Sequence, residues 1–101
     1  MISKVIGFDW DEANIEKCQK HGVPIEIIED FFMGEIRVHP DIAHSSTEDR
    51  YIAIGSTNNQ RAIFVGFAYR HGEQGLLIRP ITARYMHEKE FRKYEKAFAK
   101  I

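Results

Sequence analysis

Residues 62–84 read AIFVGFAYRHGEQGLLIRPITAR, and this segment specifies the centre of the expected sheet. Two strand-like runs, 62–70 and 76–84, flank a short polar break at 71–75. Within the first run, alternate residues fall on opposite faces, as the two-residue period of a strand requires, and both faces are largely apolar. The stretch therefore predicts a β-hairpin in the centre of a sheet, with helices covering at least one face.

The segments around this hairpin complete an α+β pattern. Strands are expected at residues 5–8, 35–39 and 50–57, and helices at about 11–21, 24–34 and 86–101. Because short turns, including Asn58-Asn59, join the strands after residue 50, those strands should pair antiparallel. We expect one domain over residues 1–101: an antiparallel meander sheet with two N-terminal helices and one C-terminal helix packed on it.

Two local features refine this expectation. The last helix carries an apolar stripe that should pack on the sheet and consists of Phe91, Tyr94, Phe98 and Ile101. In the second hairpin strand, Pro80 has no backbone N–H to donate. That strand must therefore lie at an edge of the sheet or be bulged at Pro80.

The composition bounds the class of protein. Hydrophobic residues make up 44% of the chain and charged residues 29%, which is typical of soluble globular domains. No apolar run is long enough for a membrane span, and the N-terminal residues 1–6 lack the apolar region of a secretory signal. A single cysteine, Cys18, fits a reducing compartment and buried core. We therefore expect a cytoplasmic protein with no membrane partner.

Metal and hydrolase chemistry find little support in the sequence. The five histidines, His21, His39, His44, His71 and His87, form no ligand pair of known spacing, and no cysteine pair complements them. No Gly-x-Ser-x-Gly elbow is present. We expect neither a metal nor another cofactor.

The cationic ends of the strands are the most promising place for a site. The net charge is only −1, so a polyanionic partner would have to meet a local cationic cluster. The candidates are Lys20, His21, Glu48, Arg50, Arg70, Arg79, Arg84, Tyr85, Glu90 and Tyr94. Each also has a structural explanation as a helix-end cation, a strand-edge charge or a surface pair. Arg84 fits that explanation least, because it follows the small Ala83 where the sheet passes into the last helix.

Several motifs together resemble the BrnT family, toxins of bacterial type II toxin-antitoxin systems. They are Phe8-Asp9-Trp10-Asp11, Lys20-His21-Gly22-Val23, Glu48-Asp49-Arg50, and Ala83-Arg84 followed by Glu90 and Tyr94. The resemblance covers nearly the whole chain. It implies a RelE-like ribonuclease fold, RNA as substrate and growth arrest by blocked translation. It also implies neutralisation by an antitoxin of the BrnA type, whose ribbon-helix-helix domain binds DNA. The toxin itself would then associate with DNA only through the antitoxin.

Metal-free RNA cleavage defines what the candidate residues would do. The 2′-hydroxyl must lose a proton, the leaving 5′-oxygen must gain one, and fixed cations must balance the charge on the phosphorane. Catalytic candidates are Arg84, Arg79, Arg70, Glu48 and His21, and RNA-binding candidates are Lys20, Arg50 and Tyr85. Among the arginines we expect Arg84 to matter most.

Two other interpretations stay open at the sequence level. The chain could be a non-catalytic interaction module whose basic strand ends bind a partner protein. It could also be a degenerate toxin that keeps only antitoxin binding. A small neighbouring gene with a ribbon-helix-helix pattern would separate a toxin, active or degenerate, from the interaction module. Induced expression without that neighbour separates the active toxin from the degenerate one.

Overall fold

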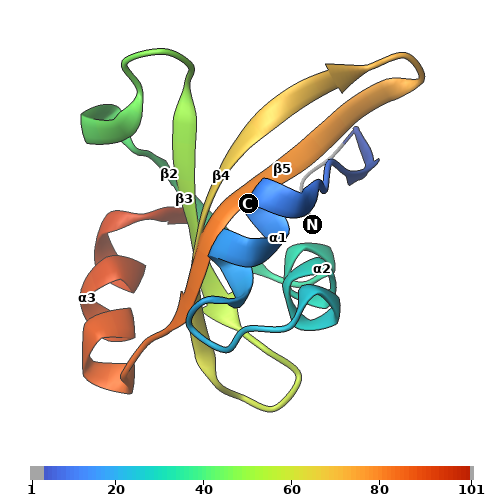
Figure 1. Cartoon of the computed structure of the whole chain (residues 1–101). Helices are drawn as coiled ribbons and strands as arrows, with labels where there is room; N and C mark the ends of the chain where they lie inside the picture. Colours follow the sequence, from blue (N-terminus) through green and yellow to red (C-terminus); the bar gives the residue numbers. More distant parts are fainter. Residues whose placement is uncertain (1–3, 101) are drawn as a thin grey trace.

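The computed structural model of the chain describes residues 4–98 and the backbone of residues 99 and 100 (Figure 1). The elements in chain order are β1 (Val5–Phe8), α1 (Glu12–Gln19), α2 (Ile25–Met33), β2 (Ile36–Pro40), η1 (Ile42–His44), β3 (Arg50–Ser56), β4 (Ala62–Gly72), β5 (Gly75–Tyr85), α3 (Glu88–Ala97) and β6 (Ala99–Lys100). This order confirms the α+β fold. Ile101 of the expected stripe and residues 1–3 of the N-terminal segment lie outside the described residues. None of the described helices is both long and apolar enough to cross a membrane.

The described strands form one mixed sheet in the order β1-β5-β4-β3-β2-β6. Strands β2 to β5 pair antiparallel in succession, which confirms the antiparallel arrangement expected over residues 50–84. The expectation of a purely antiparallel sheet is wrong, because β1 pairs parallel to β5. No hairpin turn joins these two strands, so no turn fixes their relative direction.

Pro80 lies at a β-bulge in the interior of the sheet. Gly66 of β4 pairs with Thr82, but the next residue, Phe67, pairs with Pro80, so that Ile81 is the extra residue. The bulge predicted from Pro80 is therefore confirmed, and the edge alternative is not needed. Helix α1 packs against β5 near this point, where the Asn14 side-chain amide donates to the Pro80 carbonyl at 2.8 Å.

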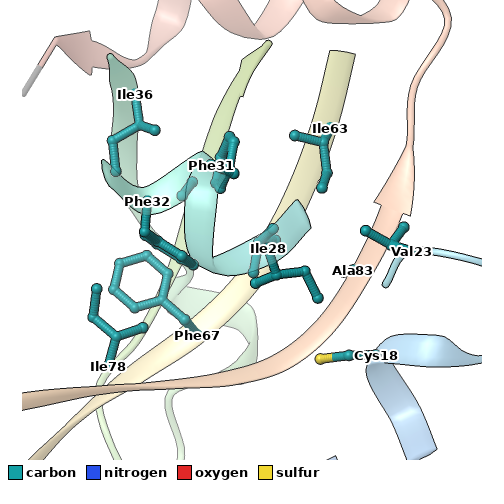
Figure 2. Packing of buried hydrophobic residues seen from close by; sticks show 12 residues of the cluster. Cys18, Val23, Ile28, Phe31, Phe32, Ile36, Ile63, Phe67, Ile78 and Ala83 are labelled. Carbon is teal, nitrogen blue, oxygen red and sulfur yellow. The ribbon is translucent and has the colours of Figure 1, made fainter. Parts of the chain in front are cut away.

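The main core lies on the face of the sheet covered by α1 and α2 (Figure 2). Ile63, Val65 and Phe67 of β4 point to this core face, and each is fully buried. Phe32 of α2 meets Phe67 edge to face, with ring centroids 5.2 Å apart. Cys18 of α1 is buried in the same cluster, and this burial raises the pKa of its thiol to about 11. The thiol is therefore protonated at neutral pH, in agreement with the core role predicted for it.

Helix α3 covers part of the opposite face, which we call the open face (Figure 1). The β4 residues that alternate with the core positions point to it, from Phe64 to Arg70. The stripe of Phe91, Tyr94 and Phe98 packs with Phe64 and with Ile54 of β3. Packing of this stripe on the sheet is thereby confirmed. Because α3 covers only one end of the open face, the other end is left for the site.

We expect Asn14→Ala to lower the free energy of unfolding by about 1–3 kcal/mol, because the substitution removes three hydrogen bonds of a buried amide. Its amide nitrogen donates to the carbonyls of Asp9 and Pro80, and its oxygen accepts from the Asp11 backbone N–H. Urea unfolding measures the change. Gln19→Ala, at an exposed position of the same helix, is the matched control and should stay within about 0.5 kcal/mol. Equal midpoints for the two variants would contradict the role given to Asn14.

Candidate nucleic-acid interface

Arginines from three neighbouring strands gather at the end of the open face that α3 leaves uncovered. Arg50 of β3 pairs with Ala68 of β4, and Ala68 pairs in turn with Arg79 of β5. Residues paired across neighbouring strands point to the same face, so Arg50 and Arg79 flank Ala68 on the open face, and Arg70 lies two residues further along β4. All three arginines line one cavity of about 200 Å³, together with Glu48 and residues of α1, which packs along β5 and contributes to this cavity as well as to the main core. We call this cavity the arginine cleft.

Carboxylates hold two of these arginines in the cleft. Glu48 accepts a hydrogen bond from Arg70. Arg79 lies 3.0 Å from Asp11 and 3.5 Å from Asp9. The bond from Arg70 lowers the pKa of Glu48, and Glu48 in turn raises the pKa of Arg70. An incoming anion must therefore compete with these carboxylates for the arginines.

Arg50 is the least occupied of the three arginines. Its nearest carboxylate oxygen, on Glu48, lies 3.7 Å away, beyond hydrogen-bond distance. Its Nε is buried, and no hydrogen-bond acceptor reaches it among the residues that the structure describes. Buried donors without a partner are rare in folded proteins. With no carboxylate at hydrogen-bond distance, Arg50 is the cleft arginine whose terminal nitrogens are best placed to donate to an anionic ligand.

A second cavity adjoins the arginine cleft and shares Arg50 and Ile81 with it. This cavity measures about 160 Å³ and is lined by Phe64, Gly66 and Thr82, with Asp41 and His44 from the η1 segment. A Cβ at Gly66 would lie 3.0 Å from the Thr82 methyl group, so glycine leaves room there. We call this cavity the Gly66 groove.

Arg84 lies on the same face, but at the α3 end. It donates both arms of its guanidinium to Glu90 at 2.9 Å, and its Cζ lies 4.5 Å from the centroid of the Phe64 ring. The hydrogen bond raises the pKa of Arg84 and lowers that of Glu90. The pair joins the first turn of α3 to β5. Arg84 is therefore already engaged, and it does not line the arginine cleft.

A family model described as the ribonuclease toxin, BrnT, of type II toxin-antitoxin systems matches residues 10–90. The chain belongs to the BrnT family. It is accordingly a ribonuclease toxin with RNA as its substrate and an antitoxin as its partner. The match includes all three cleft arginines and Arg84. A comparison with curated proteins finds no match.

The structure separates the candidate residues of this BrnT family member into two groups. Glu48, Arg50, Arg70 and Arg79 come together in the arginine cleft. Lys20 and His21 are exposed at the end of α1 and line neither cavity. Tyr85 packs against the core face, where the Arg61 guanidinium lies 3.6 Å from its ring centroid. Lys20, His21 and Tyr85 therefore do not line the cleft.

Sequence reasoning did not assign the acidic partners of the cleft to the site. Asp9 and Asp11 were named only within the motif Phe8-Asp9-Trp10-Asp11. In the structure Asp11 caps α1, accepting from the Asn14 backbone N–H at 3.1 Å. This cap is the first cause of the lowered pKa of Asp11, and Arg79 adds to it. The two aspartates that flank Trp10 were the sequence signal for an acidic contribution to the site. They reach Arg79 because β1 pairs in parallel with β5.

The histidines do not assemble a metal-binding group. In the part of the chain that the structure describes, no three His, Cys, Asp or Glu side chains lie close enough together to hold an ion. His44 instead pairs with Asp41, with 2.9 Å between Nδ1 and Oδ2, and His39 stacks on Phe98. The carboxylates at the arginine cleft bind arginines.

We expect acid to weaken the fold through the Arg84–Glu90 pair. Since Arg84 lowers the folded-state pKa of Glu90, the stabilisation is complete above the ordinary glutamate pKa of about 4.3 and is lost as the pH falls through the lower folded-state pKa. Glu90→Gln should therefore lose less stability than the parent between about pH 7 and about pH 3, measured by urea unfolding. Glu73→Gln, at an exposed hairpin position, should keep the parent's pH dependence. A full parental loss in Glu90→Gln would contradict this contribution.

Proposed function

We propose that this toxin cleaves RNA without a metal ion by binding the scissile phosphate in the arginine cleft. The observation that carries the proposal is the convergence of Arg50, Arg70 and Arg79 from three strands in one cavity. Arginine forks engage phosphate oxygens bidentately and stay charged at every accessible pH. Fixed cations at this place can stabilise the negative charge that grows on the phosphorane.

In this proposal the cleft carboxylates are counter-ions that the phosphate replaces. Glu48 positions Arg70 before RNA binds, and Asp9 and Asp11 do the same for Arg79. A lowered pKa makes Glu48 a weak base, which argues against Glu48 as the proton acceptor. Arg84 stays a candidate for RNA binding at the α3 end, where RNA would have to displace Glu90.

The test is cleavage of a labelled RNA oligonucleotide by the purified toxin in EDTA. Attack by the 2′-hydroxyl predicts a 2′,3′-cyclic phosphate and a 5′-hydroxyl as the products. Cleavage that requires added Mg²⁺ would overturn the metal-free mechanism. Intact RNA with and without Mg²⁺ would favour the degenerate toxin or the interaction module. Induced expression without the antitoxin should stop amino-acid incorporation and growth.

The antitoxin should cover the arginine cleft. We propose a small partner of the BrnA type that presents acidic and apolar groups to the cationic end of the open face. Its ribbon-helix-helix domain would bind DNA, and the toxin alone would not. The RelE-like character of the toxin fold stays a prediction.

Co-expression with the neighbouring gene product should therefore give a stable complex that no longer cleaves RNA. Charge reversal by Arg70→Glu should weaken this complex, because a buried interfacial charge pair is worth about 2–5 kcal/mol when one partner is lost. Lys93→Glu, at an exposed α3 position, serves as the control. Failure of the two proteins to co-purify at low salt would contradict the proposed partner.

A further inference from the structure

Cleavage at the arginine cleft needs a proton acceptor that the cleft itself does not supply. Arginine side chains remain protonated, so none of the three can take the proton of a 2′-hydroxyl. Glu48 is bound to Arg70, which lowers its basicity. The base should therefore be sought beside the cleft, within reach of a ribose whose phosphate lies on Arg50.

His44 lies in this position. It lines the Gly66 groove together with Arg50, which also lines the arginine cleft. Its Nδ1 lies 2.9 Å from Oδ2 of Asp41. In neutral imidazole, an Nδ1–H that donates to a carboxylate leaves the lone pair of Nε2 free to accept a proton. The His44 side chain is 69% exposed and that of Asp41 only 20%, so the ring is accessible while its partner is sheltered.

Hydrogen bonds tie the segment that carries His44 to Arg50. The Asp41 backbone N–H donates to the Arg50 carbonyl at 2.8 Å. The Arg50 backbone N–H donates to Ser45 Oγ at 2.9 Å, and this hydroxyl donates to the Asp41 carbonyl at 2.6 Å. Base and phosphate-binding cation are thus positioned relative to each other before RNA arrives, as catalysis by proximity requires.

The Asp41 side chain is used for His44 rather than for the helix. Asp41 is the N-cap residue of η1, but its carboxylate caps no backbone N–H there. Aspartate at an N-cap usually makes such a bond. The carboxylate therefore orients the imidazole at the groove, as in a carboxylate–histidine pair that fixes a tautomer.

We propose that His44, oriented by Asp41, is the general base that removes the proton of the ribose 2′-hydroxyl. This inference rests on the proposed function and adds the proton acceptor to it. Nε2 takes the proton, the 2′-oxygen forms a bond to phosphorus, and the bond from phosphorus to the 5′-oxygen breaks. The 5′-oxygen takes a proton from solvent water, and a 2′,3′-cyclic phosphate forms. Asp41, Arg50 and Tyr51 are the other titratable or charged residues that line this groove.

The experiment measures single-turnover cleavage of an RNA oligonucleotide in EDTA as a function of pH. His44→Gln should lower the rate by about 10²–10⁴-fold, the usual contribution of a general base. The rise of the wild-type rate with pH, expected for a general base, should disappear. Asp41→Asn should lower the rate by a smaller factor and keep a rise with pH. Free imidazole should restore part of the rate of His44→Ala.

A matched control is His71→Gln, because His71 is an exposed histidine that lines neither cavity. Its rate and pH profile should equal those of the wild type, and all variants should keep the wild-type melting temperature. Wild-type kinetics in His44→Gln would overturn this inference alone. So would a slower rate with an unchanged pH profile, or an unfolded variant, since both indicate a structural role. Intact RNA with the wild-type toxin would overturn the proposed function and this inference together.

Discussion

Arg50→Ala should lower the rate of RNA cleavage by about 10²–10³-fold, which corresponds to about 2.7–4 kcal/mol of transition-state stabilisation. The expectation rests on the position of Arg50, which lines both the arginine cleft and the Gly66 groove. Its nearest carboxylate oxygen lies 3.7 Å away, so its terminal guanidinium nitrogens are less engaged by carboxylates than those of Arg70 and Arg79. A preorganised donor has the largest effect where charge develops in the transition state.

The fold should tolerate this substitution. The carboxylate of Glu48 lies 3.7 Å from Arg50, and a partly exposed ion pair of this kind contributes about 0–1 kcal/mol to stability. Removal of the side chain also removes the unpaired buried Nε. The melting temperature should therefore change little while the cleavage rate falls. Both quantities can be measured on the same purified variant.

Two further arginine variants test whether the loss of cleavage in Arg50→Ala is specific to that guanidinium. Arg50→Lys keeps the charge but loses the planar fork, so it should recover only part of the rate. Arg92→Ala is the control, because Arg92 forms an exposed pair with Glu88 on α3 and lines neither cavity. Parental cleavage by Arg50→Ala would remove Arg50 from the site. A larger loss in Arg84→Ala would restore the ranking that the sequence alone suggests.

The fold features that the sequence predicts well depend on local chemistry. The hairpin between β4 and β5 follows from strand alternation on either side of a polar turn. The bulge at Pro80 follows because proline has no N–H to donate to a neighbouring strand. The parallel β1–β5 pairing was missed because it joins segments about 70 residues apart that no short turn connects.

In the candidate site, too, the features set by local sequence were predicted and those set by contacts between distant segments were not. Arg50, Arg70 and Arg79 were predicted as cations near the ends of strand-like runs, although Arg79 lies within β5. The counter-ions of Arg79, Asp9 and Asp11, come from the other end of the chain. Alternation alone could have excluded Tyr85. Adjacent strand residues point to opposite faces, so Arg84 and Tyr85 cannot both face one site. His44 lies in a short 3-10 turn, for which the sequence offers no periodic signal.

The largest effect on stability is expected from Phe67→Ala. Phe67 is fully buried at the centre of the sheet and has aromatic neighbours on three sides. Its ring centroid lies 5.2 Å from that of Phe32, 5.4 Å from that of Tyr69 and 5.7 Å from that of Tyr51. Truncating a buried phenylalanine costs about 3–5 kcal/mol, since apolar contacts are lost and a cavity remains. That is a large share of the roughly 5–15 kcal/mol that stabilises a domain.

Chemical denaturation with urea, followed by circular dichroism, measures this loss. Phe91→Ala should cost less than Phe67→Ala, because Phe91 on α3 is only half-buried. Ile42→Ala should stay within about 0.5 kcal/mol, since Ile42 is 83% exposed. The order of the three variants tests which face of the sheet holds the main core. If Phe91→Ala were the more destabilised variant, α3 rather than α2 would supply the packing on which the fold depends.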